Sequence, residues 1–346
     1  MCDIEPLNKV PGVEYKKFCG VLFITFVMLY TSTLYFGIHY QHIYEVQEYP
    51  MWKYNEDVVR TKNSVVQKIL AIGDSRMKAA FKPSLFNENM MNLSLGGGTP
   101  IEGYYTLQNY LLTNPKPENI IISYSPFHLV MQDTFWHRSV RYKYLKKSEY
   151  SEIIGYARVL NDDTLGELHR WKYYLTPNPY LRSISKGLRK KRWKNYEPVY
   201  NSLIIEKGHS YFGKNAGSSA LNTETQFDEF RHSKLIDFYL KKLIKLAAEN
   251  NITIFWYTVP FNNSSCEAIN DKFRQEYDKY VYSLEKTGVN VIRGISCVSD
   301  SSFGDSSHLY SGVEMETRKI VRAVNEETGF LINTPHYFNG GGQVHF

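Results

Sequence analysis

Short apolar runs alternate with longer amphipathic stretches along most of this chain. Each short run is bounded by turn residues, so we expect strands at 68–73, 91–95, 119–124, 252–259 and 289–292. Helices are expected at 77–87, 101–113, 230–250, 266–286 and 312–325, and in 230–250 the apolar residues recur every three or four positions. This alternation predicts an α/β fold, a three-layer sandwich around a central, mainly parallel sheet.

Residues 127–228 interrupt the alternation. They are rich in Tyr, Trp and basic residues and contain no long apolar strand. We interpret them as a partly helical insertion over the edge of the sheet that carries the chemistry. Their densest basic run is 186–194. A solvated helix face explains such a run, and so does contact with anionic lipid headgroups or an acidic polysaccharide.

A segment near the N-terminus is apolar over a length that suits a lipid bilayer. Residues 18–44 contain no Asp, Glu, Lys or Arg, and about 20 apolar residues cross the hydrocarbon core as a helix. We expect a transmembrane helix at 18–40 after a cytoplasmic N-terminus (1–17), because Lys16 and Lys17 precede it and acidic residues follow it. A cleaved signal peptide is the alternative, but bulky residues follow the run instead of a small-residue cleavage pattern.

The remaining chain divides into a polar, Tyr-rich connector (41–65), one catalytic domain (66–330, including the insertion) and a glycine-rich tail (331–346). With the expected transmembrane helix, we predict a single-pass protein of the cell membrane whose catalytic domain is periplasmic or extracellular. A net charge of +6 is modest, and no nucleic-acid motif is visible, so nucleic acid is not an expected partner. Cys266 and Cys297 share the exported compartment, where a disulfide is allowed but not required. No His or Cys cluster has ligand spacing, so we expect no metal and no cofactor.

Two short motifs at opposite ends of the predicted domain carry the candidate chemistry. Gly-Asp-Ser, ending at Ser75, follows the first strand, and Asp305-Ser-Ser-His308 precedes the last helix. A serine hydroxyl becomes a nucleophile when a neutral His, oriented by a carboxylate, takes its proton. Loops at the carboxyl ends of parallel strands meet at one edge of the sheet. We therefore predict a catalytic triad of Ser75, Asp305 and His308.

Further residues near the serine are candidates for binding. The oxyanion of an acyl-transfer intermediate needs preorganised donors, and the backbone N–H groups of Ser75, Gly97 and Gly98 are the candidates, although a plain tight turn also explains the glycines. Asp74 is expected to hold the turn by accepting from backbone amides. Arg76 is expected either to contact an anionic substrate group or to point to solvent.

These motifs resemble the SGNH (GDSL-type) hydrolase superfamily. Gly-Asp-Ser75 matches its first block, Gly97 its second, and Asp305 with His308 its fifth. The resemblance covers roughly 66–125 and 230–328 and implies an SGNH, flavodoxin-like sandwich. The third block of the family carries an oxyanion-hole Asn, which this chain lacks after its third strand. Ser125 and His128 are weak candidates to replace it, and the alternative is that two backbone amides suffice.

With its single N-terminal anchor, the chain is similar to the membrane-anchored branch that includes DltD and the alginate acetylation proteins. That similarity implies a serine O-acyltransferase that acetylates or acylates a surface polysaccharide through an acyl-serine, beside a membrane-bound O-acyltransferase partner. An esterase acting on a carbohydrate or lipid ester uses the same triad. A third hypothesis is a catalytically silent module that binds glycan or a partner.

Overall fold

The computed structural model describes residues 12–46, 48–166, 177–213 and 217–329. The chain forms two compact units. The first comprises 1–46 and 171–196, and the second comprises 47–170 and 197–346. The predicted tail, 331–346, lies outside the described residues.

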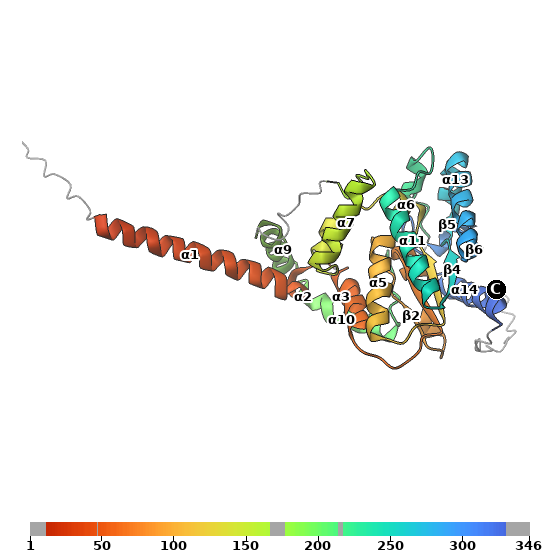
Figure 1. The fold of residues 1–346 in the computed structure, drawn as a ribbon, viewed down its shortest axis with the longest axis horizontal. Coiled ribbons are helices and arrows are strands. Elements are labelled where there is room, and N and C mark those ends of the chain that lie inside the picture. The colour runs from red at the N-terminus through yellow and green to blue at the C-terminus, as the bar shows by residue number, and fades with distance from the viewer. Residues whose placement is uncertain (1–11, 47, 167–176, 214–216, 330–346) are drawn as a thin grey trace, which may run out of the picture. The chain divides into compact units, whose positions relative to one another are not determined.

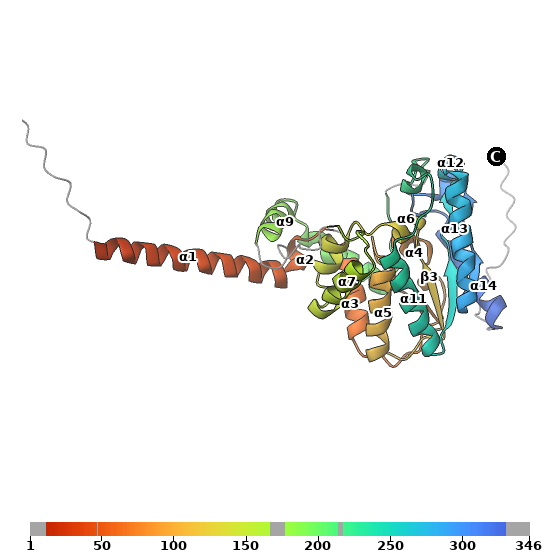
Figure 2. The same cartoon turned by 45° about the horizontal axis from the view of Figure 1, so that its top comes forward.

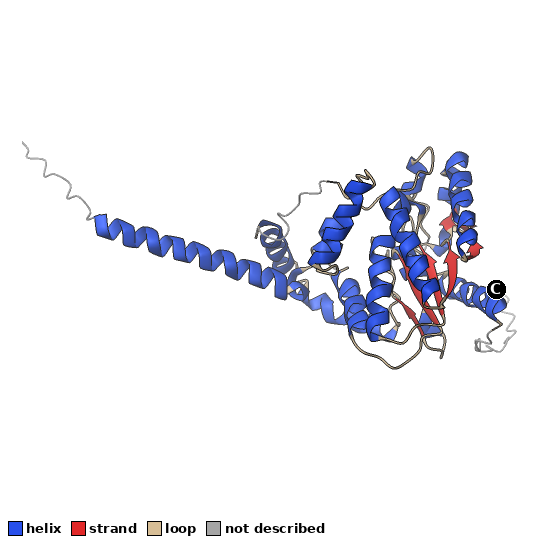
Figure 3. Ribbon diagram, in the orientation of Figure 1, coloured by secondary structure: helices blue, strands red, loops and turns tan. Residues whose placement is uncertain are grey.

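The second unit is built on a five-stranded parallel sheet, drawn in red in Figure 3. In the order β2-β1-β3-β4-β6, its strands are β2 (Met90–Asn92), β1 (Ile69–Gly73), β3 (Asn119–Ser123), β4 (Thr253–Tyr257) and β6 (Asn290–Arg293). The chain leaves β1 toward one side and returns to its other side with β3. The carboxyl ends of β1 and β3 therefore flank the switch point of the sheet, where α/β proteins commonly bind ligands.

Helices cover both faces of this sheet, as the alternation of the sequence predicts (Figures 1 and 2). Ile69 and Ala71 of β1 belong to one apolar cluster with residues of α4 (Ser75–Ala80) and α14 (Val313–Thr328). On the opposite face, α5 (Pro100–Thr113) and α11 (Lys234–Glu249) lie side by side and contact β1 and β4. Each fully buried Ile or Leu stabilises the fold by about 1.5–3 kcal/mol.

The remaining helices of the second unit lie before the first strand or between the strands. They are α3 (Tyr49–Arg60), α6 (Pro126–Val130), α7 (Lys147–Val159), α10 (Trp193–Ile205, which begins in the first unit), α12 (Asn263–Ala268) and α13 (Asp271–Ser283), with a π-helical turn at Phe135–Val140 and 3₁₀ turns at Pro83–Leu85, Thr223–Gln226, Leu284–Thr287 and Asp300–Ser302. A small second sheet pairs β5 (Phe261–Asn262) with β7 (Cys297–Val298).

Helix α3 differs from the expectation of a polar connector at 41–65. Its buried residues include Met51, Trp52, Asn55 and Val59, which recur at helical spacing, and it packs against α5. Pro50 stands in its first turn, where the missing N–H costs nothing. Much of the expected connector is therefore a helix of the second unit.

The first unit contains α1 (Gly12–His39), α2 (Gln41–Tyr44) and α9 (Asn178–Arg189). Residues 15–39 of α1 are long and apolar enough to cross a membrane, and few of them are buried against protein. The middle of the insertion, 171–196, thus belongs to the unit of the apolar helix, while its remainder belongs to the unit of the sheet.

Candidate active site

Ser75 lies at the start of α4, directly after β1 and a single linking residue. Gly73 ends the strand, and a side chain there would collide with the carbonyl oxygen of Ser123 on β3. Asp74 caps α4 by accepting from the backbone N–H of Arg76 at 2.9 Å. The tight strand-to-helix turn leaves Ser75 half-buried while its neighbours are buried. The buried strand β1 is thus followed by a serine that is partly accessible to solvent.

Asp305 and His308 come from one short loop between a 3₁₀ turn and α14. An isolated antiparallel bridge between Phe303 and Leu309 closes the loop, and Gly304 N–H donates to His308 O at 2.9 Å. Oδ1 of Asp305 accepts from the backbone N–H groups of Ser307 and His308, each at 2.9 Å. The spacing of two residues between Asp and His therefore builds a self-supporting loop.

The three predicted triad residues are hydrogen-bonded to one another. His308 Nε2 lies 2.8 Å from Ser75 Oγ, and His308 Nδ1 lies 2.8 Å from Oδ2 and 2.9 Å from Oδ1 of Asp305. Partial burial raises the pKa of Asp305, but the hydrogen bonds from His308 and Ser307 outweigh it and hold that pKa below its usual value. An ionised carboxylate only accepts, so Nδ1 carries the proton and Nε2 of the neutral ring accepts from Ser75.

The imidazole is also held from one side by an aromatic ring of the insertion. Phe212 stacks on His308 with ring centroids 4.4 Å apart and an interplanar angle of 21°. The following residue, Gly213, has φ of 81°, and a side chain there would strike the backbone of Gly304. The insertion therefore supplies a contact to the candidate base, which no local sequence pattern indicates.

The glycine turn after β2 leaves one of its two expected donors without a partner among the described residues. Gly98 N–H donates to Leu95 O at 3.0 Å, so the prediction of Gly98 as an oxyanion donor is wrong, because the turn itself uses this amide. Gly97 has φ of 70°, and the structure gives its N–H, like that of Ser75, no partner among the described residues. Thr134 and Arg138 donate to the carbonyls of Gly97 and Gly96 at 2.7 and 2.8 Å and hold the turn in place.

A second carboxylate–histidine pair begins at the residue before Ser75. Asp74 is fully buried, and its Oδ2 accepts from Ser125 N–H and from His128 Nδ1, both at 2.8 Å. Burial raises the pKa of Asp74, but the bonds from His128, the charge of Arg76 and the bond from Ser125 hold that pKa far below its usual value. The expectation that Asp74 holds the turn through backbone amides is confirmed.

Ser125 and His128 therefore lie together beside the serine turn. Ser125 Oγ lies 3.1 Å from His128 Nδ1. Since ionised Asp74 only accepts, Nδ1 is the donor to both oxygens, and the Ser125 O–H hydrogen is left for another acceptor. Ser125 occupies the second position after β3, and the described residues provide no acceptor for its hydroxyl hydrogen.

Arg76 is buried, so the alternative that it points to solvent is wrong. Its Nη2 lies 2.6 Å from Glu224 Oε2, and its guanidinium carbon lies 5.0 Å from the centroid of the Phe261 ring. Glu224 is itself fully buried and also accepts from Phe127 N–H at 3.2 Å. Nη1 of Arg76 is buried with no hydrogen-bond partner among the described residues.

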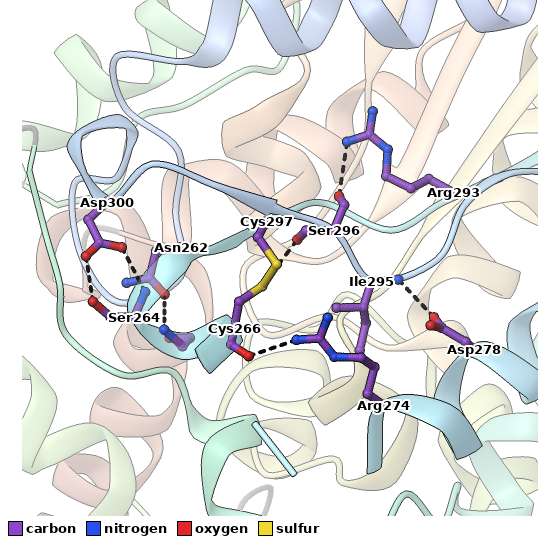
Figure 4. Close-up of a disulfide and its surroundings, with 11 residues drawn as sticks. Asn262, Ser264, Cys266, Arg274, Asp278, Arg293, Ile295, Ser296, Cys297 and Asp300 are labelled. Atoms are coloured by element: carbon purple, nitrogen blue, oxygen red, sulfur yellow. Dashed lines mark hydrogen bonds between the residues drawn. A yellow bond between two sulfur atoms is a disulfide. The ribbon is translucent and has the colours of Figure 1, made fainter. Parts of the chain in front are cut away.

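A disulfide fixes the chain that leads into the Asp305–His308 loop. Cys266 and Cys297, whose pairing the sequence leaves open, are bonded and join α12 to β7 (Figure 4). Arg274 donates to Cys266 O at 2.8 Å, and Asp300 accepts from Ser264 N–H at 3.0 Å. Closing a loop of this length stabilises a fold by about 3–4 kcal/mol in the chain-entropy account.

Within the described ranges, no three His, Cys, Asp or Glu side chains are grouped so that they could hold a metal ion. The groups that meet at this site are a serine hydroxyl, an imidazole, a carboxylate and several N–H or O–H donors. Comparison with known proteins adds no relative: no family model matches the chain, and no curated protein is significantly similar to it.

Proposed function

We propose that this protein is a serine acyl-transfer enzyme in which Ser75 is the nucleophile, His308 the base and Asp305 the carboxylate that orients the base. The hydrogen-bonded series from Ser75 Oγ through His308 to Asp305 is the observation that carries the proposal. Its distances fall in the range in which a proton passes between heavy atoms during general-base catalysis.

In the first half of the reaction, Ser75 Oγ attacks the carbonyl carbon of an acyl ester while His308 Nε2 takes the hydroxyl proton. The resulting imidazolium keeps its Nδ1–H on Asp305, which stabilises the positive charge. The intermediate collapses, the bond to the alcohol oxygen breaks, and His308 returns the proton to that oxygen. The product is an acyl-Ser75 ester and a free alcohol.

In the second half, an acceptor hydroxyl gives its proton to His308 Nε2 and attacks the acyl-serine carbonyl. The Ser75 Oγ leaves and recovers the proton from His308, so the enzyme is regenerated. When the acceptor is a sugar hydroxyl the reaction is a transfer, and when it is water the reaction is a hydrolysis. Asp305 stays ionised throughout.

Three donors serve the oxyanion in this proposal. The backbone N–H groups of Ser75 and Gly97 are without partners among the described residues, which suits donors kept free for a substrate. Ser125 supplies the third through its hydroxyl, in place of the Asn that the SGNH pattern has after the third strand. Asp74 and His128 hold Ser125 in position.

We place the domain in the SGNH class on two grounds. The strand order β2-β1-β3-β4-β6 is the flavodoxin-like order, with the serine turn at the switch point. The three matching motifs lie at the carboxyl ends of β1 and β2 and before α14. The membrane-anchored branch of that class favours a surface polysaccharide as acceptor and a membrane-bound O-acyltransferase as partner.

The exported location is part of the same proposal. Helix α1 is taken as a single uncleaved span with the N-terminus cytoplasmic, and the second unit as periplasmic or extracellular. The disulfide between Cys266 and Cys297 supports this, because disulfides persist in oxidising compartments.

A fluorophosphonate probe tests the enzyme directly, because it phosphonylates only an activated serine and releases fluoride. Full-length protein in detergent should be labelled, Ser75→Ala should not, and His308→Ala should be labelled at least 1,000-fold more slowly, in line with the cost of removing a triad member. Ser306→Ala, in the same loop, is the matched control and should label normally. A folded protein that takes no label would favour the silent binding module.

The acceptor is tested in the host cell. O-acetyl content of the surface polysaccharide should fall in cells that carry Ser75→Ala in place of the native protein. Unchanged O-acetyl content together with normal labelling of the native protein would assign an esterase instead.

A further inference from the structure

The first unit carries a dense positive surface next to the apolar helix. Its exposed cations come from α9 and the residues that follow it, and within the described ranges none is paired with a carboxylate. We call these residues the basic surface: Arg182, Lys186, Arg189, Lys190, Lys191 and Lys194. The stretch 171–196 contains no Asp or Glu, so no acidic residue of its own offsets this charge.

Two glycines fix α9 against the C-terminal end of α1 and against α2. A side chain at Gly37 would lie 2.6 Å from the Tyr180 ring, and one at Gly187 would strike the backbone of Tyr44. Arg192 Nη1 also donates to Tyr44 O at 3.3 Å. Because α1, α2 and α9 belong to one compact unit, the basic surface has a defined place along α1.

That place corresponds to the edge of a bilayer. Counted from Phe18, about 20 residues at 1.5 Å per residue span the roughly 30 Å hydrocarbon core, which ends near Gly37. Aromatic rings gather at the same level: the centroid of Tyr40 lies 5.2 Å from that of Phe36 and 6.3 Å from that of Tyr35. Such aromatic belts mark the membrane–water interface.

The faces of α9 suit a helix lying in that interface. Tyr180 and Gly187 face α1 and α2. Leu181 and Leu188, seven residues apart and therefore on one side, are 49% and 44% exposed. The cations of α9 occupy the remaining side. Exposed apolar residues next to a cationic face are typical of helices that rest on anionic membranes.

From this arrangement we propose that α9 is an interfacial helix whose basic surface binds the anionic phospholipid headgroups of the bilayer that α1 spans. The exposed side chains of Leu181 and Leu188 insert beside this surface, at the boundary between the headgroups and the acyl chains. An acidic polysaccharide would suit the cations, but it would leave Leu181 and Leu188 without a role. The inference rests on the proposed membrane span and is independent of the serine chemistry.

The test uses the full-length chain in nanodiscs of zwitterionic phosphatidylcholine alone or with phosphatidylglycerol. Cys2→Ser and Cys19→Ala remove the other thiols outside the disulfide, and an environment-sensitive fluorophore is attached at Leu188→Cys. Spin-labelled lipids then report contact by quenching. Leu29→Cys, in the middle of α1, reports the span itself, and Val159→Cys, which is exposed in the second unit, reports water.

We expect the fluorophore at 188 to be quenched several-fold more in the phosphatidylglycerol discs than in the neutral discs. Arg182→Gln, Lys186→Gln and Arg189→Gln together should weaken that contact about 100-fold, since each cation near an anionic surface contributes about 1 kcal/mol. The matched control removes three exposed charges of the second unit, in Lys234→Gln, Lys279→Gln and Lys286→Gln, and should leave the quenching unchanged.

Equal quenching at 188 in neutral and anionic discs would overturn the proposal, and so would an unquenched fluorophore at 29, which would remove the span on which it rests. Binding of polygalacturonate by protein in neutral discs, lost in the same α9 triple variant, would reassign the surface to an acidic glycan. None of these outcomes alters serine labelling, so a failure here is separate from a failure of the proposed enzyme.

Discussion

Two carboxylate–histidine pairs serve the turn that carries Ser75, and they differ in burial and in connection. In the Asp305–His308 pair, the side chains are 36% and 15% exposed, and the imidazole reaches the serine. In the Asp74–His128 pair, they are 0% and 11% exposed, and the carboxylate joins the turn after β1 to the turn after β3. In the proposed enzyme, the same chemical pair thus orients a base in one place and joins two turns of the sheet edge in the other.

Hydrogen-bond partners, more than residue type, therefore distinguish the proposed catalytic pair from the structural one. Among the described residues, Asp305 is bonded only within its own loop, so its removal should spare the fold. Asp74 is bonded to three residues, Arg76 in its own turn and Ser125 and His128 after β3, so its removal should loosen the edge of the sheet.

Asp305→Asn should lower kcat/KM for a simple phenyl ester by about 10⁴, because the amide favours the wrong tautomer of His308. Its Tm should change little. The matched control is Asp300→Asn, which alters the chain just before the loop without touching the base. An activity within tenfold of the unaltered protein would remove Asp305 from the triad.

Asp74→Asn should lower the free energy of unfolding by about 3 kcal/mol, because fully buried Asp74 accepts three hydrogen bonds that an amide cannot all accept. Chemical denaturation measures this, with Asp305→Asn as the comparison. If Asp305→Asn destabilises the protein as much as Asp74→Asn, the distinction between the two pairs is wrong.

Ser125→Ala should reduce kcat about 100-fold and leave KM nearly unchanged, which is the effect of losing one oxyanion donor. Ser94→Ala is the control, because Ser94 is another buried serine whose hydroxyl has no partner in the described residues. A proportional rise in KM would instead make Ser125 a ground-state binding residue.

Acid titration should distinguish the contributions of Asp74 and Asp305 to the free energy of unfolding. The pKa of Asp74 is lower in the folded protein than in the unfolded chain, so its stabilisation is present above about pH 4 and is lost as the pH falls below that. The loss should be on the order of 2 kcal/mol in the unaltered protein and absent in Asp74→Asn. Asp305→Asn should retain most of it, because that carboxylate is more exposed and better screened.

Phe212→Ala should slow ester turnover about tenfold, since stacking of aromatic rings contributes about 0.5–1.5 kcal/mol beyond burial. Phe212→Tyr keeps the ring and should restore the rate. An unchanged rate in Phe212→Ala would show that the Asp305 loop alone orients the imidazole.

The sequence predicted the parts of the site that are local. The strand before Ser75 is a short apolar run, and the two residues between Asp305 and His308 let one loop hold both groups. Sequence analysis did not predict the pairs Asp74–His128 and Arg76–Glu224, because their members lie 54 and 148 residues apart. Only the strand order brings them together, and periodicity carries no information on strand order.

Helix α3 was missed for a different reason. Its buried positions recur at helical spacing, but tyrosines and charges between them made the stretch look like a polar connector. Tyrosine occurs both in buried cores and on solvent-exposed surfaces, so composition alone does not show whether a tyrosine-rich stretch is buried. The same ambiguity hid the division of the insertion between the two units.

The most direct test of the proposed triad is the rate at which a fluorophosphonate modifies the full-length protein, with the adduct located by peptide mass spectrometry. The triad predicts an adduct on Ser75, formed at least 1,000-fold more slowly in His308→Ala but no more than about 100-fold more slowly in His128→Ala, where at most one oxyanion donor is disturbed. An adduct on another residue, or an equal loss in the two histidine variants, would contradict it.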